Sequence, residues 1–243
     1  KNDIWEQMIP HIDHIEQIYF AGGEPLIMQE HYNILKELVK RERFDVKLIY
    51  NTNFNETLYK DLDVLDYWGM FDSVSIGASL DASGSRAELM RKGSDWAKTT
   101  ANRERMLEVC PDVDFYISPT VSLMNVQHVP DFHRDWIERG LLKPQDLNVN
   151  VLQSPDWYRV DCLPKDMKQD VTAKLEEHIA WLSPQDHLQR ATNGFRSTIS
   201  FMNSQDNTQH LKKFNQVTAQ LDGVRTENFY EVFPELASLQ VYA

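Results

Sequence analysis

The sequence is poor in cysteine and contains no long apolar run. Among its 243 residues, the cysteines are Cys110 and Cys162, which stand far apart. Two isolated thiols exclude a disulfide framework and favour a reducing compartment, so we predict a cytoplasmic protein. No apolar stretch approaches the length that spans a bilayer, and no secretory signal is recognised. The sequence therefore does not predict a membrane protein.

Positive charge and glycine are also scarce. The chain has 25 Lys and Arg against 37 Asp and Glu, a formal net charge of −12, so neither nucleic acid nor an anionic membrane is predicted as a partner. None of its nine glycines falls in a G-x-x-x-x-G-K-[ST] or G-x-G-x-x-G pattern, which excludes these phosphate-binding loops. No spacing of ligand residues predicts a metal site within the chain, and no residue is assigned as general acid, general base or nucleophile.

The first two-thirds of the chain alternates between strand-like and helix-like segments. Runs rich in Val, Ile, Phe and Tyr predict strands at 17–20, 46–50, 73–78, 113–117 and 147–152. Amphipathic segments such as 31–43 separate these runs and predict helices. This alternation predicts an α/β fold with parallel strands, either an open sheet or a barrel.

After Pro164 the strand pattern stops. Apolar residues recur at helical spacing in the segments 167–182, 188–202 and 211–221, which predicts helices that bury one face. We therefore divide the chain into a βα part, residues 1–160, and a helical C-terminal extension, residues 161–243, which we expect to pack on the first part.

Small or polar residues directly follow the predicted strands. They include Gly22, Gly23, Glu24, Asn53, Ser79, Asp81 and Ser118. Because the carboxyl ends of parallel strands meet at one edge of the sheet, we expect these residues to form a ligand site. Each of them alone could instead cap a helix or form a turn.

The stretch FAGGEP, residues 20–25, is the most informative of these loops. Its glycines allow the backbone to approach a ligand, and Pro25 fixes the direction in which the chain leaves. The carboxylate of Glu24 would repel a phosphate. It suits an ammonium group, another cation or a proton-transfer role.

This stretch resembles the GGEP motif of radical S-adenosylmethionine (radical SAM) enzymes. The segments YNTN, residues 50–53, and SLD, residues 79–81, resemble the ends of the next two strands of that family. The stretches SRAELMRKGSDWAKTTANRERML and LDGVRTENFYEVFPEL resemble twitch domain-containing radical SAM proteins. One departure is Ala82, at a position where many relatives have glycine.

The resemblance implies a partial TIM-like (β/α) barrel and a set of cofactor contacts. Residues Gly22, Gly23, Glu24 and Pro25 would receive the amino group of the methionine moiety of S-adenosylmethionine. The resemblance further implies that Ser79, Asp81 and Arg91 approach its ribose and carboxylate. Asn53 and Ser118 are additional candidates.

The family also uses a C-x-x-x-C-x-x-C loop, which this sequence lacks. Its thiolates hold a [4Fe–4S] cluster that cleaves S-adenosylmethionine to a 5′-deoxyadenosyl radical. We therefore expect a fragment of a radical SAM enzyme without its N-terminal part, inactive alone and binding S-adenosylmethionine weakly or not at all. Loss of the first barrel strand would expose a sheet edge, which predicts a homodimer formed through that edge.

Two other interpretations remain open. The chain could be a cluster-free binding or interaction module that keeps the barrel surface without the chemistry. It could also be a barrel hydrolase in which Glu24 and Asp81 act as a carboxylate pair. A C-x-x-x-C-x-x-C motif in the upstream sequence would discriminate between these interpretations. The substrate, the product and the electron donor are not indicated.

Overall fold

The computed structural model describes residues 7–242, which form two compact units. Unit 1 comprises residues 7–79 and 94–117, and unit 2 comprises residues 80–93 and 118–242. The expected division after residue 160 differs from this one, because unit 2 holds strands as well as the helices that follow Pro164. The predicted division into two domains after residue 160 stays a prediction.

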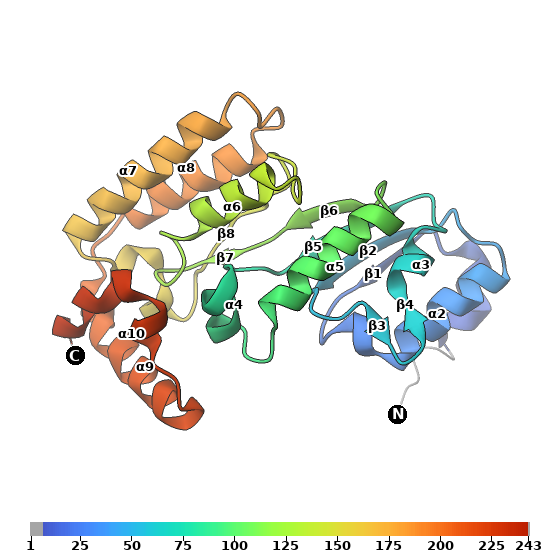
Figure 1. Ribbon diagram of the computed structural model, residues 1–243, viewed down its shortest axis with the longest axis horizontal. Coiled ribbons are helices and arrows are strands. Elements are labelled where there is room, and N and C mark those ends of the chain that lie inside the picture. Colours follow the sequence, from blue (N-terminus) through green and yellow to red (C-terminus); the bar gives the residue numbers. More distant parts are fainter. Residues whose placement is uncertain (1–6, 243) are drawn as a thin grey trace. The chain divides into compact units, whose positions relative to one another are not determined.

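Unit 1 is built around a parallel sheet with the strand order β1-β2-β5-β6 (Figure 1). The strands of unit 1 are β1 (Gln17–Phe20), β2 (Lys47–Thr52), β3 (Leu58–Tyr59), β4 (Leu62–Asp63), β5 (Val74–Ala78) and β6 (Asp114–Ile117). Its helices are η1 (Ile9–His14), η2 (Pro25–Ile27), α2 (Gln29–Lys40), α3 (Val64–Trp68) and α5 (Trp96–Val109). The short strands β3 and β4 form an antiparallel hairpin that the sequence did not predict.

The sheet buries one face because apolar side chains alternate along its strands. Tyr50, Ile76 and Phe115 lie in register on β2, β5 and β6, and each is nearly inaccessible to solvent. Helices α2, α3 and α5 lie on one side of this sheet (Figure 1). The prediction of an α/β fold with parallel strands is therefore confirmed. The first four predicted strands correspond to β1, β2, β5 and β6, which begin and end within two residues of the expected bounds.

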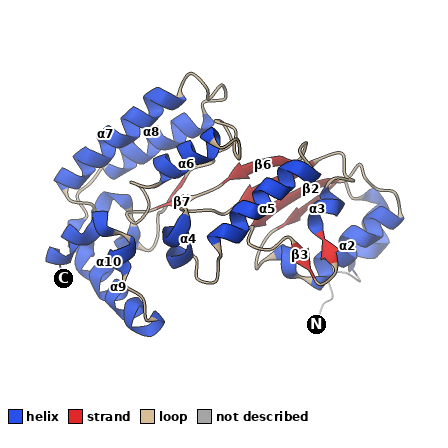
Figure 2. Cartoon of the chain, viewed as in Figure 1, coloured by secondary structure: helices blue, strands red, loops and turns tan. Residues whose placement is uncertain are grey.

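Unit 2 is mostly helical, as Figure 2 shows for the segment after β8. Its strands are β7 (Thr120–Val121) and β8 (Asn150–Val151), which pair in parallel. Its α-helices are α4 (Gly84–Met90), α6 (Val129–Glu138), α7 (Lys165–Leu182), α8 (Arg190–Met202), α9 (Leu211–Arg225) and α10 (Phe229–Val232). Its 3₁₀ turns are η3 (Asp156–Tyr158), η4 (Val160–Cys162), η5 (Thr208–His210) and η6 (Pro234–Tyr242). The three helices expected after Pro164 correspond to α7, α8 and α9.

The fifth predicted strand, 147–152, was wrong in its extent. Within it the structure has the two-residue strand β8, which pairs with β7 rather than with the sheet of unit 1. Asparagine side chains compete with a strand ladder for backbone groups. Here Asn150 Nδ2 donates to Asn148 O at 3.2 Å, which occupies a backbone acceptor beside the short strand, and to Ser118 Oγ at 2.9 Å.

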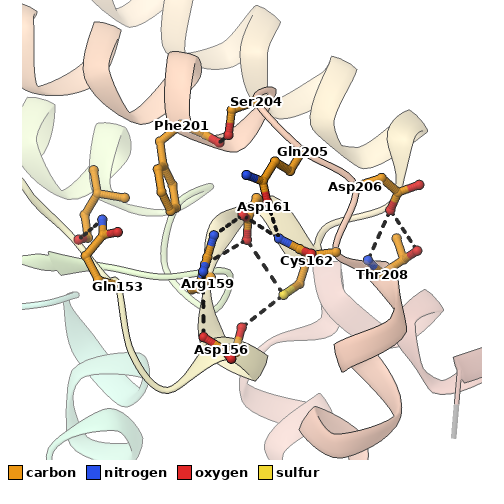
Figure 3. A network of polar contacts seen from close by, with 12 residues as sticks. Gln153, Asp156, Arg159, Asp161, Cys162, Phe201, Ser204, Gln205, Asp206 and Thr208 are labelled. Carbon is orange, nitrogen blue, oxygen red and sulfur yellow. Dashed lines mark hydrogen bonds and ion pairs between the residues drawn. The ribbon is translucent and has the colours of Figure 1, made fainter.

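A buried carboxylate ties the 3₁₀ turn η4 to the segment before η5 (Figure 3). The side chain of Asp161 is fully buried and accepts hydrogen bonds from Arg159 Nε at 3.2 Å and from Asn207 Nδ2 at 2.8 Å. Asn207 N also donates to Asp161 O at 3.2 Å. The hydrogen bond to Asp161 raises the pKa of Arg159, which keeps the guanidinium charged.

Helix α8 packs closely on the segment before β8 at Gly194. A Cβ added there would lie 2.7 Å from Val149 Cβ and 2.8 Å from Val149 Cγ2, and a β-branched neighbour cannot rotate away easily. We expect Gly194→Ala to lower the free energy of unfolding by about 1–3 kcal/mol, because overpacking outweighs the gain in helix propensity.

Urea denaturation measures this effect, and Gly223→Ala is the matched control. Gly223 lies in α9 with nothing within 4 Å of its added Cβ, so that substitution is expected to stabilise by up to about 1 kcal/mol. A Gly194→Ala variant as stable as the Gly223→Ala variant would show that Val149 can move aside without lowering the free energy of unfolding.

Between residues 7 and 242, no helix combines the length and the apolar character needed to cross a bilayer.

Candidate functional site

The loop after β1 turns sharply at its two glycines. Gly22 has φ 81° and Gly23 has φ 53°, a left-handed conformation that residues with a Cβ rarely adopt. A Cβ on Gly22 would meet no atom within 4 Å. The backbone conformation rather than crowding therefore requires glycine here, and the space beside the loop is open.

This turn brings the Glu24 carboxylate to the end of the neighbouring strand β2. Glu24 Oε1 accepts hydrogen bonds from Thr52 Oγ1 at 2.6 Å and from Leu26 N at 3.2 Å, and Oε2 accepts one from Asn53 N at 2.7 Å. Thr52 Oγ1 accepts in turn from Phe54 N at 2.9 Å. The carboxylate thus clamps the end of β1 to the end of β2.

The clamp leaves part of the acceptor capacity of this loop unused. An ionised carboxylate offers about four lone-pair positions, and Glu24 uses three of them for the donors of unit 1. The carbonyl oxygens of Gly22 and Gly23 accept no hydrogen bond from any described residue. A donor with several N–H groups could therefore bind to the remaining oxygen positions, and a negative ligand would be repelled.

Asn53 and Ser79, also predicted for the site, lie in unit 1 and support its strand ends. Asn53 Oδ1 accepts from Asn55 N at 2.9 Å, and Asn55 Oδ1 accepts from Asp95 N at 2.7 Å. Ser79 N donates to Thr52 O at 2.8 Å, which continues the pairing of β5 with β2. Pro25 is buried and begins η2 directly after Glu24.

The other predicted residues, Asp81, Arg91 and Ser118, belong to unit 2. Asp81 is largely buried, and its Oδ2 accepts from Arg91 Nε at 2.7 Å while its Oδ1 accepts from Thr120 N at 2.7 Å. Ser118 Oγ accepts from Asn150 Nδ2 at 2.9 Å. Arg91, which the resemblance pairs with a cofactor carboxylate, is paired here with a carboxylate of its own unit.

The predicted site is thus divided between the units, and each part is defined within its own unit. The contribution of these residues to cofactor binding stays a prediction. The hydrolase interpretation gains no support, because Glu24 and Asp81 are both held by several hydrogen-bond donors.

Thr52 is a site residue that the sequence reasoning missed. Its hydroxyl makes the shortest hydrogen bond to Glu24, although only its neighbour Asn53 was considered. Its position at the end of a predicted strand, in a run of polar residues, is the signal that could have identified it.

The two cysteines do not fit an iron–sulfur cluster. Cys110 belongs to unit 1 and Cys162 to unit 2, and both are buried. Burial raises the pKa of the Cys110 thiol to about 11 and that of Cys162 to about 12, and two cysteines are fewer than the thiolates that hold a cluster. Residues 7–242 contain no group of three or more His, Cys, Asp or Glu side chains arranged to hold a metal ion.

Comparison with known proteins shows that the fold of this chain is similar to that of solved structures. No protein-family model matches the sequence, and no curated protein matches it. The structure is similar to native anSMEcpe with bound AdoMet (S-adenosylmethionine), with a TM-score of 0.53 and 18% identity over 74% of this chain and 51% of that chain. The form with bound AdoMet and Cp18Cys peptide gives a TM-score of 0.50 with the same identity and coverage.

These matches concern a radical SAM enzyme. The chain spans about half the length of the solved structures that it matches. At this identity the likeness shows the fold alone, an α/β fold with a parallel four-stranded sheet that resembles part of a radical SAM barrel.

Proposed function

We propose that this chain is the S-adenosylmethionine-binding part of a radical SAM enzyme, with Glu24 as the acceptor for the methionine ammonium group. The Glu24 clamp carries the proposal. It presents a fixed carboxylate with unused acceptor capacity beside Gly22 and Gly23, where the space is open. The likeness to structures with bound AdoMet supports the same ligand.

The chemistry of the ligand matches the loop. An ammonium group carries three N–H donors and a positive charge, and hydrogen bonds between charged groups are about twice as strong as neutral ones. Glu24 and the carbonyl oxygens of Gly22 and Gly23 offer acceptors on one loop. Pro25 and the three hydrogen bonds of Glu24 hold the end of the loop, so little entropy is lost at the carboxylate when a ligand binds.

For the whole protein we propose that S-adenosylmethionine is reductively cleaved and that hydrogen is then abstracted from an unidentified substrate. When bound, the [4Fe–4S] cluster of such enzymes supplies the electron. The described residues do not hold such a cluster, so this chain is proposed to bind and orient the cofactor and to be inactive by itself.

The test is a titration of the ¹⁵N-labelled chain with S-adenosylmethionine, followed through the backbone amides of Gly22 and Gly23. We expect weak, saturable shifts at these amides, and much smaller shifts with 5′-methylthioadenosine, which lacks the amino-acid moiety. Glu24→Gln is expected to weaken binding about tenfold or more, the effect of losing a charge-assisted hydrogen bond.

The matched control is Glu30→Gln, which removes an exposed carboxylate from the first turn of α2 and should leave binding unchanged. Tight binding that survives Glu24→Ala would contradict both the weak affinity and the role of this carboxylate. Equal responses to the two ligands would show that the amino group is not recognised.

A further inference from the structure

Unit 2 contains a cavity of about 210 Å³ that the proposed function does not use. It lies between the end of α4, the end of α9 and the start of α10, and one of its lining residues, Leu221, is 36% exposed. A cavity of about 150 Å³ is enough to bind benzene. This one therefore has room for an aromatic ring or a branched chain together with a short polar group.

The cavity is formed by a sharp reversal of the chain after α9. Thr226 has φ 55° and ψ 46°, an unusual conformation for a β-branched residue, and it ends the helix. Glu227 N then donates to Asp222 O at 3.2 Å, and Phe229 N donates to both carboxylate oxygens of Asp222 at 3.1 Å. The reversal places Arg225 and Phe229 on the wall of the same cavity.

One wall of the cavity is apolar and polarisable. Met90 comes from the end of α4, Met124 from the segment after β7, and Phe229 from α10. Thioether and aromatic side chains adapt to flat or branched apolar groups and contact aromatic rings favourably. This wall suits the apolar body of a ligand.

The charged side chains at the cavity differ in how far their hydrogen-bonding capacity is used. Asp222 accepts the Phe229 amide on both oxygens, and Glu227 forms an ion pair with Lys92. Arg225 makes a single hydrogen bond to the described residues, from Nη1 to Leu89 O at 3.4 Å, and lies 4.0 Å from Glu227 Oε2. A guanidinium has five N–H donors, so most of those of Arg225 remain available.

We propose that this cavity binds a small monocarboxylate with an apolar body. The two oxygens of a carboxylate match the fork of N–H donors on Arg225, which a neutral polar group cannot do as well. Glu227 already forms an ion pair with Lys92 and approaches Arg225 only to 4.0 Å, so a ligand carboxylate could compete with it for the guanidinium. The ring or branched chain of the ligand lies against Met90, Met124 and Phe229. The site is independent of the proposed role of Glu24.

The experiment uses the full chain labelled with [¹³C-methyl]methionine and 3-phenylpropionate as the probe, with 3-phenylpropan-1-ol as the uncharged comparison. We expect saturable shifts of the Met90 and Met124 methyl signals with the acid. The alcohol is expected to bind about tenfold or more weakly, because it cannot form the charge-assisted pair. The remaining methionines serve as internal references.

Arg225→Gln is expected to abolish the preference for the acid over the alcohol. Lys212→Gln, which removes an exposed positive charge from the same helix, should preserve it. Equal affinity for acid and alcohol in the unsubstituted chain would overturn the proposal, and so would an absence of shifts at Met90 and Met124. The comparison of acid and alcohol in the unsubstituted chain needs no variant, so it tests the proposed carboxylate site even if Arg225→Gln does not fold. Glu24→Gln should leave this binding unchanged.

Discussion

Replacing Asp161 by alanine is expected to lower the free energy of unfolding of unit 2 by about 3–5 kcal/mol, the cost of leaving one partner of a buried ion pair alone. The Asp161 side chain holds Arg159 (Figure 3). It is fully buried and also accepts a hydrogen bond from Asn207. Arg159 is 21% exposed, so water could replace only part of what its guanidinium loses. The amide of Asn207 would lose its carboxylate acceptor as well.

Urea denaturation followed by circular dichroism measures this loss, and Asp156→Ala is the matched control. Asp156 contacts the same guanidinium at 3.7 Å, but its side chain is 57% exposed. An exposed ion pair contributes at most about 1 kcal/mol, so the control should remain close to the unsubstituted protein. Equal effects of the two substitutions would mean that burial of Asp161 does not determine the strength of the network.

Lowering the pH below about 6.5 is expected to destabilise both units, and unit 2 more steeply. Burial lowers the pKa of His31 in unit 1 to about 3, that of His133 in unit 2 to about 3, and that of His178 to about 4. His133 Nδ1 and His178 Nε2 lie 3.0 Å apart and share a hydrogen bond, while His31 Nε2 lies 2.9 Å from Tyr50 Oη.

The sign follows from proton binding. Between pH 6.5 and about 4 the unfolded chain carries protons on these histidines and the folded chain does not, so stability falls as the pH falls. Each such histidine contributes at most about 1.4 kcal/mol per pH unit. Burial also lowers the pKa of His128 in unit 2, so unit 2, with His128, His133 and His178, should lose stability at least about twice as fast as unit 1, which has His31.

The test is urea denaturation at a series of pH values, with amide signals from each unit reporting separately. His178→Gln keeps a hydrogen-bond donor for His133 and cannot titrate, so the slope for unit 2 should fall by about 1.4 kcal/mol per pH unit. The control His187→Gln changes an exposed residue and should keep the slope. A slope for unit 2 that is unaffected by His178→Gln would rule out this pair as the cause.

The sheet and its first polar loop could be predicted from the sequence because both depend on local patterns. Short runs of β-branched and aromatic residues identified the four strands of the parallel sheet, β1, β2, β5 and β6. The two glycines before Glu24 predicted an open turn, and they do have positive φ. This conformation by itself requires glycine, and the expected approach of a ligand to the loop stays a prediction.

The remaining features depend on contacts between distant residues, which local patterns do not encode. Nothing around Asp161 distinguishes it from an exposed acid, because its burial depends on Asn207, which lies 46 positions away. Arg91 matched a cofactor-binding pattern, yet its pairing with Asp81 required the structure. The strand predicted at 147–152 has a regular pattern, and the hydrogen bond of Asn150 to Ser118, 32 positions away, is not visible in it.

The clamp at Glu24 is the first member of a series of side chains that each hold the next backbone amide. Glu24 accepts the amide of Asn53, Asn53 that of Asn55, Asn55 that of Asp95, and Asp95 that of Lys98, where α5 begins. Replacing one member leaves the next amide without its acceptor, so the fitness effect of a substitution at one position depends on the residues at the others. In evolutionary terms these positions form an epistatic group, and we expect homologous chains to change them together rather than singly.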